Sequence, residues 1–220
     1  MTASPGAASE WTRRLSAYRS PILARSLFEL AVTALPFAAL FALAWAALSV
    51  SPWIAVALSL ANAAFVVRLF MIQHDCGHGS FFGSRPLNDW VGRAIGVLTL
   101  TPYDVWRRSH ATHHATTGNL DRRGMGDIPT LTVAEYRARP LLGRVLYRLV
   151  RNPVVLFGIA PSYMFFLQSR LPVGAMRSGW RFWVSALGTD AAILTLLGTL
   201  YMLGGWPVLV FVYLPMMLLE

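Results

Sequence analysis

Two long apolar runs, residues 27–50 and 53–72, follow one another near the start of the chain, with only Ser51 and Pro52 between them. A helix needs about 20 apolar residues to cross the hydrocarbon core of a bilayer, and both runs reach that length. Two helices joined by so short a turn pack antiparallel. The sequence therefore predicts a transmembrane hairpin over residues 27–72.

The composition of the whole chain agrees with a membrane protein. Hydrophobic residues make up 55% of the 220 residues and the mean hydropathy is +0.51, which exceeds what the core of a soluble domain requires. All 19 basic residues are arginine, and the net charge is +9. Arginine-rich loops are typical of the cytoplasmic side of membrane proteins, so this charge does not indicate a nucleic-acid partner. We expect an all-α integral membrane protein built as a multi-span helical bundle.

Charge and apolar length divide the rest of the chain. Residues 1–26 carry arginines and apolar side chains at helical spacing, which predicts a helix on the cytoplasmic surface of the membrane. Residues 73–152 hold most of the charges and no spanning run, which predicts a cytosolic helical cap. Three apolar segments follow: a re-entrant or interfacial helix over 154–167 broken near Pro161, a span over 182–203, and the start of a further span over 207–220.

Charged residues also fall inside the predicted spans. Glu29, near the start of the first run, and Arg68, near the end of the second, lie at similar depth in an antiparallel pair. Charges inside a membrane tend to pair, but each side chain can also extend separately to the interface, and the sequence leaves both interpretations open. Asp190 lies inside the span 182–203, and the sequence identifies no basic partner for it.

All five histidines of the chain fall in two short motifs. The first motif holds His74 and His78, and the second holds His110, His113 and His114. Residues three and four apart share one face of a helix, and imidazole is the commonest metal ligand among side chains. Neither motif alone fills the coordination sphere of an iron ion. We therefore expect the two motifs to converge on one histidine-rich metal site in the cap.

Polar residues near the two motifs are candidates for orienting the ligands, because a metal-bound histidine usually donates its second N–H to a carboxylate or carbonyl. Asp104 has a different expected role: with Thr101 and Pro102 it forms a helix-start signal, which favours capping. The candidates are Asp75, Asn119, Asp121 and Asp127.

Other classes of protein use histidines at similar spacing. A zinc protease places two histidines and a glutamate in one helical motif, but aspartate replaces that glutamate in residues 74–78, and the second motif would be surplus. A bis-histidine haem protein needs ligands on opposing helices, whereas the second motif crowds one side. A membrane interaction protein without a catalytic role is a further alternative.

The two motifs and the residues around them resemble the histidine boxes of the integral-membrane fatty acid desaturase family, of the bacterial acyl-lipid type. The resemblance is carried by residues 74–82, 109–116, 118–121 and 126–128, and it covers about residues 70–135. Outside that range only the order of the apolar segments is similar.

The resemblance implies a mushroom-shaped bundle of spans with a cytosolic cap, in the bacterial plasma membrane. It implies a pair of non-haem iron ions bound by His74, His78, His110, His113 and His114. Such a centre uses O2 to introduce a cis double bond into the acyl chain of a lipid, with electrons from ferredoxin or a similar donor. Hydroxylases and ketolases that act on alkanes or carotenoids carry the same boxes, so they are alternatives.

The family carries a third histidine box beyond its last span, and this chain has no histidine after His114. Five imidazoles do not fill the coordination spheres of two iron ions. The segment 207–220 is also too short to return to the cytoplasm. We therefore expect residues 1–220 to be one partial desaturase domain that is inactive by itself.

Arginines dominate the charges of the predicted cap. They could steer an acidic electron donor to the site, or they could contact anionic membrane lipid. The lipid interpretation suits the stripe formed by Arg144, Arg148 and Arg151 at helical spacing. The remaining candidates are Arg107, Arg108, Arg122 and Arg123.

Overall fold

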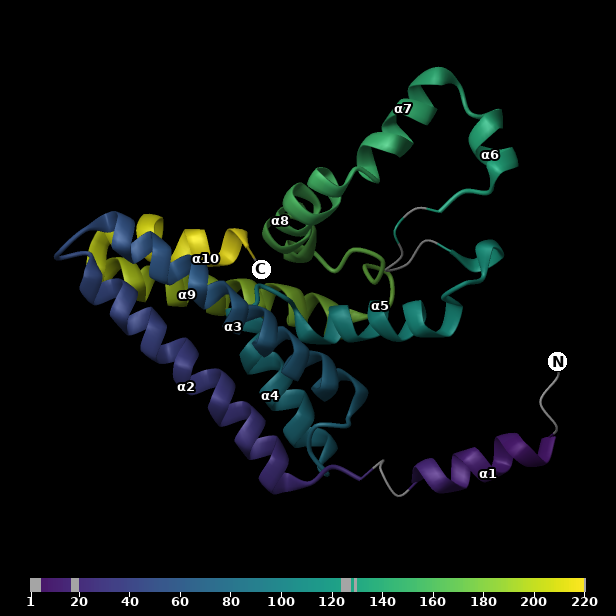
Figure 1. Cartoon of the computed structure of the whole chain (residues 1–220), viewed down its shortest axis with the longest axis horizontal. Coiled ribbons are helices and arrows are strands. Elements are labelled where there is room, and N and C mark those ends of the chain that lie inside the picture. The colour runs from purple at the N-terminus through teal and green to yellow at the C-terminus, as the bar shows by residue number, and fades with distance from the viewer. Residues whose placement is uncertain (1–4, 17–19, 124–127, 129, 220) are drawn as a thin grey trace.

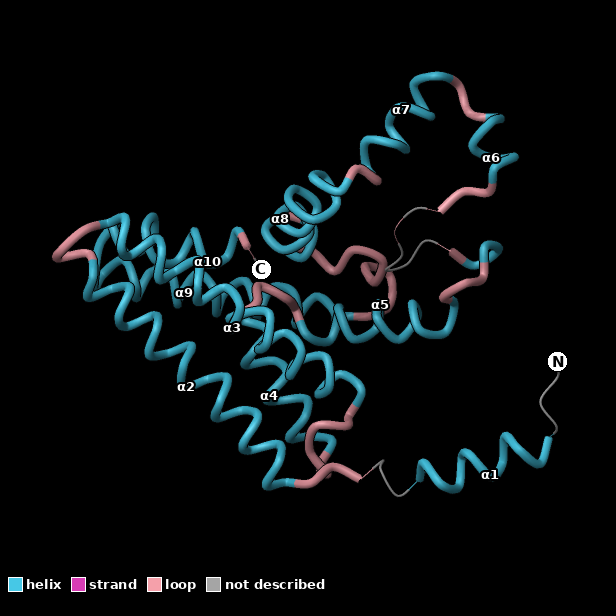
Figure 2. The backbone as a smooth tube through the Cα atoms, viewed as in Figure 1, coloured by secondary structure: helices cyan, strands magenta, loops and turns pink. Residues whose placement is uncertain are grey.

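The structure is a computed structural model that describes residues 5–16, 20–123, 128 and 130–219. Within those residues every regular element is a helix and no strand occurs, which confirms the expected all-α class (Figure 2). The α-helices are α1 (Pro5–Ser16), α2 (Leu23–Ala47), α3 (Pro52–His78), α4 (Arg85–Leu98), α5 (Tyr103–Thr116), α6 (Val133–Ala138), α7 (Leu141–Val150), α8 (Ala160–Phe166), α9 (Trp180–Val208) and α10 (Leu214–Leu218). Short 3-10 or π-helical segments are η1 (Leu120–Arg122), η2 (Val155–Ile159), η3 (Gln168–Arg170) and η4 (Leu209–Tyr213).

Helices α2 and α3 pack as an antiparallel pair: the start of α2 contacts the turn after the end of α3, and the middles of the two helices contact one another (Figure 1). Ser26 Oγ donates to Phe81 O at 2.5 Å, and Asn62 Nδ2 donates to Phe37 O at 3.2 Å. The short turn between the helices ends at Ser51, whose side-chain oxygen caps the start of α3. The second helix of the pair continues past the apolar run and ends at the first histidine motif.

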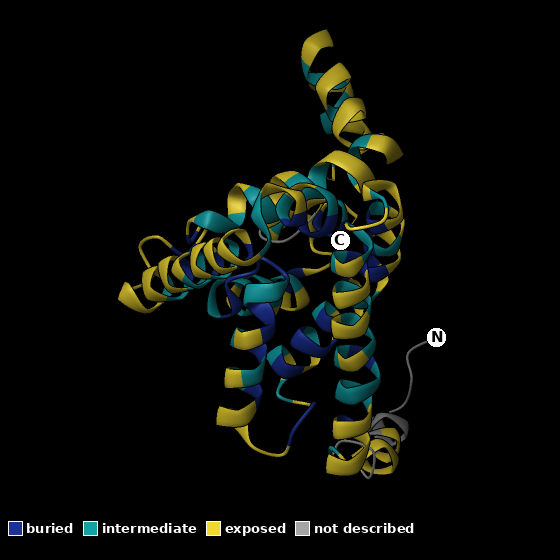
Figure 3. Cartoon of the chain, turned by 90° about the vertical axis from the view of Figure 1, so that its left-hand side faces the viewer, coloured by how far each residue is buried: buried dark blue, intermediate teal, exposed yellow. Residues whose placement is uncertain are grey.

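Three helical runs among the described residues are long and apolar enough to cross a membrane: α2, α3, and the run 180–218 that contains α9 and α10. Few residues in their most apolar stretches are buried inside the protein, 11% in α2 and 33% in α3. Exposed residues instead cover the outer faces of the long helices (Figure 3). Outward apolar side chains are expected of helices that have lipid as their solvent. The expected helical bundle with several candidate spans is therefore confirmed.

The apolar run that contains α9 and α10 reverses direction partway along. Gly205 has φ +66° and ψ −167°, a conformation that essentially only glycine adopts. Beyond this turn, Val212 O accepts a hydrogen bond from Ser59 Oγ, and Met216 Sδ lies 3.3 Å from Asn62 Nδ2. The later residue on α3 contacts the later residue of this segment. The segment η4–α10 therefore runs parallel to α3, toward the end of α3 that carries the histidines (Figure 1).

Two apolar cores hold the helices together. The first joins α2, α3, α9 and the segment after the Gly205 turn. The second joins the end of α3 to α4 and to the start of α5, so it fixes the part of α3 that carries the first histidine motif. The buried side chains of this second core are Leu69, Ile72, Cys76, Phe81, Phe82, Ile95 and Tyr103.

The charged residues inside the apolar helices have partners. Arg68 Nη2 lies 3.2 Å from Glu29 Oε2, and Arg68 Nε donates to Thr33 Oγ1 at 3.3 Å. The paired interpretation of Glu29 and Arg68 is therefore the one that the structure adopts. Asp190 pairs with Arg170, which lies in η3 just after α8. This ion pair ties the end of the α8 segment to α9.

Helices α6 and α7 project away from the α2–α4 bundle (Figure 1), whereas α8 contacts it: the ring of Phe165 lies 6.1 Å from that of Phe70 on α3. Helix α7 and the run Val155–Arg170 are bent by 59° relative to one another, as in a broken span or a re-entrant loop. The bend lies between residue 150 and residue 155, so the expected break near Pro161 was wrong. Pro161 lies in the first turn of α8, directly after the π-helical segment η2, and the helix continues through it.

Candidate metal centre

The two histidine motifs lie on α3 and α5. Helix α3 ends at His78, and Gly79 follows it with φ +72°, a left-handed conformation that glycine adopts without strain. The Gly79 N–H donates to Cys76 O at 2.9 Å and so closes the last turn. The second motif occupies the last two turns of α5, which packs against α3. The candidate metal site is therefore built on two helices and not on loops.

Four histidines form one group, which we call the four-histidine cluster: His74, His78, His110 and His114. One ring nitrogen from each lies within 4.8 Å of those of the other three. His110 Nε2 lies at the centre, 3.1 Å from His78 Nε2 and 3.0 Å from His114 Nε2. The prediction that the two motifs converge is confirmed for these four residues.

His113 lies beside the four-histidine cluster. Its ring centroid is 6.3 Å from that of His110 and 5.8 Å from that of His114, and Thr117 Oγ1 lies 3.3 Å from its Nε2. Successive residues of an α-helix point about 100° apart around the axis, so His113 and His114 point in different directions. The ring of His114 lies 5.0 Å from that of His78 on α3, whereas the ring contacts of His113 given above are with His110 and His114 of its own helix.

The protonation of His110 favours metal binding. Its pKa is lowered to about 4, first by burial and then by the neighbouring imidazoles of His74, His114, His78 and His113. A ring with so low a pKa is neutral at physiological pH, and a neutral imidazole offers the lone pair that a metal requires.

Trp106 forms a wall of the cluster that sequence reasoning did not identify. Its ring stacks on His110 at 4.7 Å with an interplanar angle of 13°, and it lies 6.0 Å from His74. A Cβ atom on Gly77 would come within 2.7 Å of Trp106 Cζ3, so Gly77 leaves the space that the indole fills. The spacing of four residues between Trp106 and His110 was the available signal, because it places both on one helix face.

The polar residues that the sequence suggested for orienting the histidines do not all contact them. Asp75 Oδ1 lies 3.2 Å from His74 Nδ1, which is the contact expected of a residue that orients a ligand. Asn119 Oδ1 accepts a hydrogen bond from Asp121 N at 3.0 Å and caps η1. The side chain of Asn119 thus has the local role that loop solvation and capping predict. Asp127 lies outside the described residues.

Asp104 does not cap α5, so that expectation was wrong. The N-cap position is Pro102, and no side chain caps the helix there. Both carboxylate oxygens of Asp104 instead accept hydrogen bonds from Arg93, at 2.9 and 3.0 Å. Helix α4 presents Arg93 across the first turn of α5, and a bidentate guanidinium pair is a stronger partner for a carboxylate than a backbone N–H.

The four-histidine cluster fits a metal ion. Its ring nitrogens are close enough together to share one ion, and imidazole suits iron, zinc, copper and nickel. A zinc-protease site would use one motif alone, whereas here both motifs contribute. The closest ring centroids are 4.5–5.0 Å apart, which leaves no room for a haem between two of these rings.

Comparison with known proteins agrees with this site. The sequence signature of the family described as "Fatty acid desaturase" matches residues 51–220. A fatty acid desaturase of Bacillus subtilis (strain 168) is 39% identical over 209 residues, which cover 95% of this chain and 59% of that protein. A Synechocystis protein named sn-1 acyl-lipid omega-3 desaturase (ferredoxin) is 40% identical over 99 residues, 43% of this chain and 26% of that protein.

A third relative, from Helianthus annuus, is named sn-2 acyl-lipid omega-3 desaturase (ferredoxin), chloroplastic, and is 34% identical over 104 residues, 47% of this chain and 22% of that protein. The chain spans less than two thirds of the length of each of these relatives. No solved structure matches it. The family signature covers more than half of the chain, including both histidine motifs, and the chain is a membrane protein of the fatty acid desaturase family.

Proposed function

We propose that this chain carries the catalytic centre of an enzyme that introduces a cis double bond into a fatty acyl chain. Two hydrogens leave adjacent carbons of the chain, and O2 takes up these hydrogens, two electrons and two protons to give two molecules of water. The four-histidine cluster at the end of an apolar helix is the observation that carries this proposal, because an acyl chain dissolved in the membrane reaches a metal there.

Iron is the proposed metal, and when bound it supplies the redox chemistry that activates O2. The chain's own side chains hold the metal and keep it in place. Asp75 fixes the ring of His74 through its contact with Nδ1, and Trp106 with Phe70, 5.5 Å apart edge to face, packs beside the cluster and limits the access of water. The proposed ligands are His74, His78, His110, His113 and His114.

The proposed substrate is an acyl chain carried by a membrane lipid, and the proposed electron donor is a ferredoxin or a protein like it. The names of the Synechocystis and Helianthus relatives support both choices. Arg107 and Arg123 are weaker candidates for docking an acidic donor than their sequence position suggests, because each is paired, with Asp89 and Glu135 respectively. Arg108, whose guanidinium stacks on a phenylalanine ring, is exposed and is the better candidate.

The proposed location is a bacterial plasma membrane, crossed more than once, with the N-terminus and the histidines on the cytoplasmic side. Helix α1 lies on the membrane surface in this arrangement, and the bent α7–α8 segment re-enters it. Arginines on α7 alternate with exposed apolar side chains such as Leu142 and Leu146, which suits contact with anionic lipid.

The test expresses the gene with all of its coding sequence, including any beyond residue 220, in a host whose fatty acids lack the product, because residues 1–220 alone are expected to be inactive. The lipids are analysed by mass spectrometry. We expect acyl chains that have lost two hydrogens, and we expect His110→Ala to abolish them because His110 is central to the cluster. The control is Gly83→Ala, at a position where a methyl group meets open space. Products that gain an oxygen would identify a hydroxylase or ketolase instead, and product formation that survives His110→Ala would contradict the metal role.

A further inference from the structure

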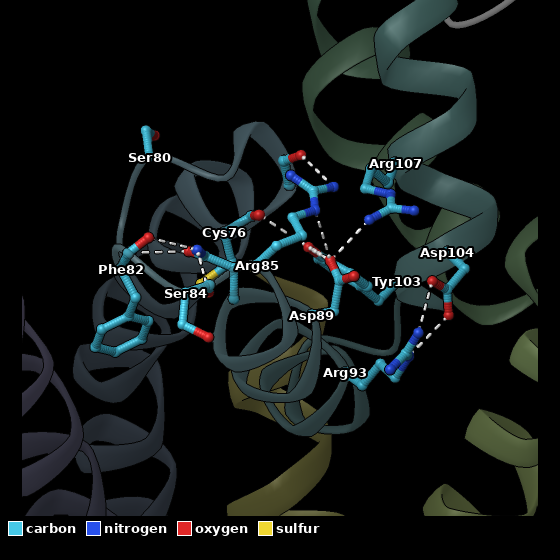
Figure 4. Close-up of polar contacts among 12 residues, drawn as sticks. Cys76, Ser80, Phe82, Ser84, Arg85, Asp89, Arg93, Tyr103, Asp104 and Arg107 are labelled. Carbon is cyan, nitrogen blue, oxygen red and sulfur yellow. Dashed lines mark hydrogen bonds and ion pairs between the residues drawn. The ribbon is translucent and has the colours of Figure 1, made fainter. Parts of the chain in front are cut away.

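Asp89 on α4 is the centre of a polar network beside the cluster (Figure 4). Its Oδ1 accepts hydrogen bonds from Arg107 Nη1 at 2.7 Å and from Tyr103 Oη at 3.0 Å, and Arg85 Nε lies 3.4 Å away. The Asp89 side chain is 19% exposed and Tyr103 is fully buried. A carboxylate held by three donors in a partly buried site has one defined position.

The network around Asp89 reaches both helices that carry the histidines. Tyr103 and Arg107 lie on α5, seven and three residues before His110. Tyr103 Oη also lies 2.9 Å from Cys76 O on α3, so its single proton is within reach of both acceptors. Asp89 therefore connects to α5 directly and to α3 through Tyr103.

Arg85 makes a second link to α3. Its Nη2 donates to Gly77 O at 3.5 Å, while its Nε faces Asp89. Cys76 and Gly77 both lie between His74 and His78. The carbonyls that the network engages are thus within the first histidine motif itself.

Close packing fixes the distance between α4 and α5 at the same place. A Cβ atom on Gly92 would come within 2.2 Å of Tyr103 Cε2, and one on Gly96 within 2.4 Å of Thr101 O. Asp89, Gly92 and Gly96 share one face of α4 by their spacing of three and four. Tyr103 therefore lies flat on α4, with its hydroxyl directed to Asp89.

We propose that Asp89 is a positioning residue for the metal site: through Tyr103, Arg107 and Arg85 it holds the last turns of α3 and the middle of α5 in the register at which the four imidazoles meet. This role rests on the proposed function of the cluster as a metal site. Removing the carboxylate charge takes from two guanidinium groups the anion that they share and weakens the hydrogen bond from Tyr103, so the common anchor of the two motifs is loosened.

Asp104 provides a matched control. Its ion pair with Arg93 also joins α5 to α4, and Asp104→Asn makes the same chemical change as Asp89→Asn. Among the described residues, the hydrogen bonds, ion pair and ring contact of Arg93 and Asp104 reach α4, α5 and α9 and involve no residue of α3. A general loss of α4–α5 stability should therefore affect both variants, whereas loss of motif register should affect only Asp89→Asn.

The experiment titrates Co(II), as the probe metal, into the purified full chain in detergent and follows the visible spectrum, which reports the number and geometry of the imidazole ligands. Residues that orient metal ligands typically contribute about 10- to 100-fold in metal affinity, and we expect Asp89→Asn to lose that much with a changed spectrum. Asp104→Asn should stay within about 3-fold of the unchanged chain. Tyr103→Phe, which keeps the ring on Gly92 but loses the link to Cys76 O, should give an intermediate loss even if Asp89→Asn does not fold.

Thermal unfolding of the metal-free proteins separates positioning from stability. We expect similar metal-free midpoints for Asp89→Asn and Asp104→Asn, with weakened Co(II) binding in the first alone. Unchanged Co(II) affinity and spectrum in Asp89→Asn and Tyr103→Phe, or an equal loss in Asp104→Asn, would overturn the positioning role. An unsubstituted chain that binds no Co(II) would instead overturn the proposed metal site on which this role depends.

Discussion

At the scale of single residues, the shape of the metal centre depends on where a side chain is absent. Gly77 lies between the two histidines that α3 contributes to the four-histidine cluster, and the indole of Trp106 occupies the space in front of it. The same indole stacks on His110 of α5. One residue without a side chain on α3 thereby allows an aromatic ring on α5 to reach both helices.

This contact predicts that Gly77→Ala is destabilising. Alanine is the better helix former, by about 0.5–1 kcal/mol, but its methyl group would overlap the Trp106 ring at 2.7 Å. Overpacking of this kind costs about 1–3 kcal/mol, so the clash should prevail and move the ring from His110. Denaturant unfolding in detergent measures the change, with Gly83→Ala as the control because no atom lies within 4 Å of the added methyl group. Equal unfolding free energies for the two variants would contradict the packing described here.

Individual site residues could be predicted from the sequence where they belong to a residue type that is rare in this chain. The five histidines are scarce and clustered, so their spacing was sufficient to predict the converging motifs. Asp89 gave no such signal, because its importance comes from the docking of α4 against two other helices. Asn119 and Asp121 were selected for their closeness in sequence to the ligands, yet they contact one another.

At the scale of helices, hydropathy predicted the α2–α3 pair but not its full length. Helix α3 runs to His78, six residues beyond the apolar run, and the left-handed Gly79 ends it. Glu29 could be suggested as a partner for Arg68 because the two residues lie at similar depth in an antiparallel helix pair. The partner of Asp190 could not be chosen in this way, because the position of Arg170 depends on the bend between α7 and α8.

The turn at Gly205 is the element-scale feature most sensitive to substitution. Its φ of +66° and ψ of −167° fall in a region open essentially to glycine alone, so Gly205→Ala should cost about 1–3 kcal/mol. Gly198 lies inside α9 with open space around it, and Gly198→Ala should leave stability unchanged or raise it by about 0.5–1 kcal/mol. Unfolding in detergent, followed by circular dichroism, compares the two. A Gly205→Ala protein as stable as Gly198→Ala would argue against the reversal of the chain at this point.

At the scale of the whole molecule, the family relationship extends beyond the histidine motifs. Sequence reasoning placed a close resemblance at about residues 70–135, whereas the family signature covers 51–220 and the Bacillus relative aligns over 95% of the chain. Apolar segments vary in sequence while their lengths are kept, because lipid-facing positions require hydrophobicity and little else. The arrangement of α6, α7 and α8 was the part of the fold that could least be predicted from the sequence.

A metal bound by the four-histidine cluster would join α3, which belongs to the apolar bundle, to α5, which lies outside it. Binding to the folded state alone stabilises a protein by about 2.7 kcal/mol when the free ligand is about 100 times its Kd. We therefore expect Co(II) at that concentration to raise the free energy of unfolding by this amount, and a chelator to reverse the gain. His110→Ala should abolish the gain, because His110 Nε2 lies 3.0–3.1 Å from two other ring nitrogens. His113→Ala should retain most of the gain from the first ion, since His113 lies beside the cluster, and an equal loss in both variants would show that all the imidazoles of α5 bind one ion together.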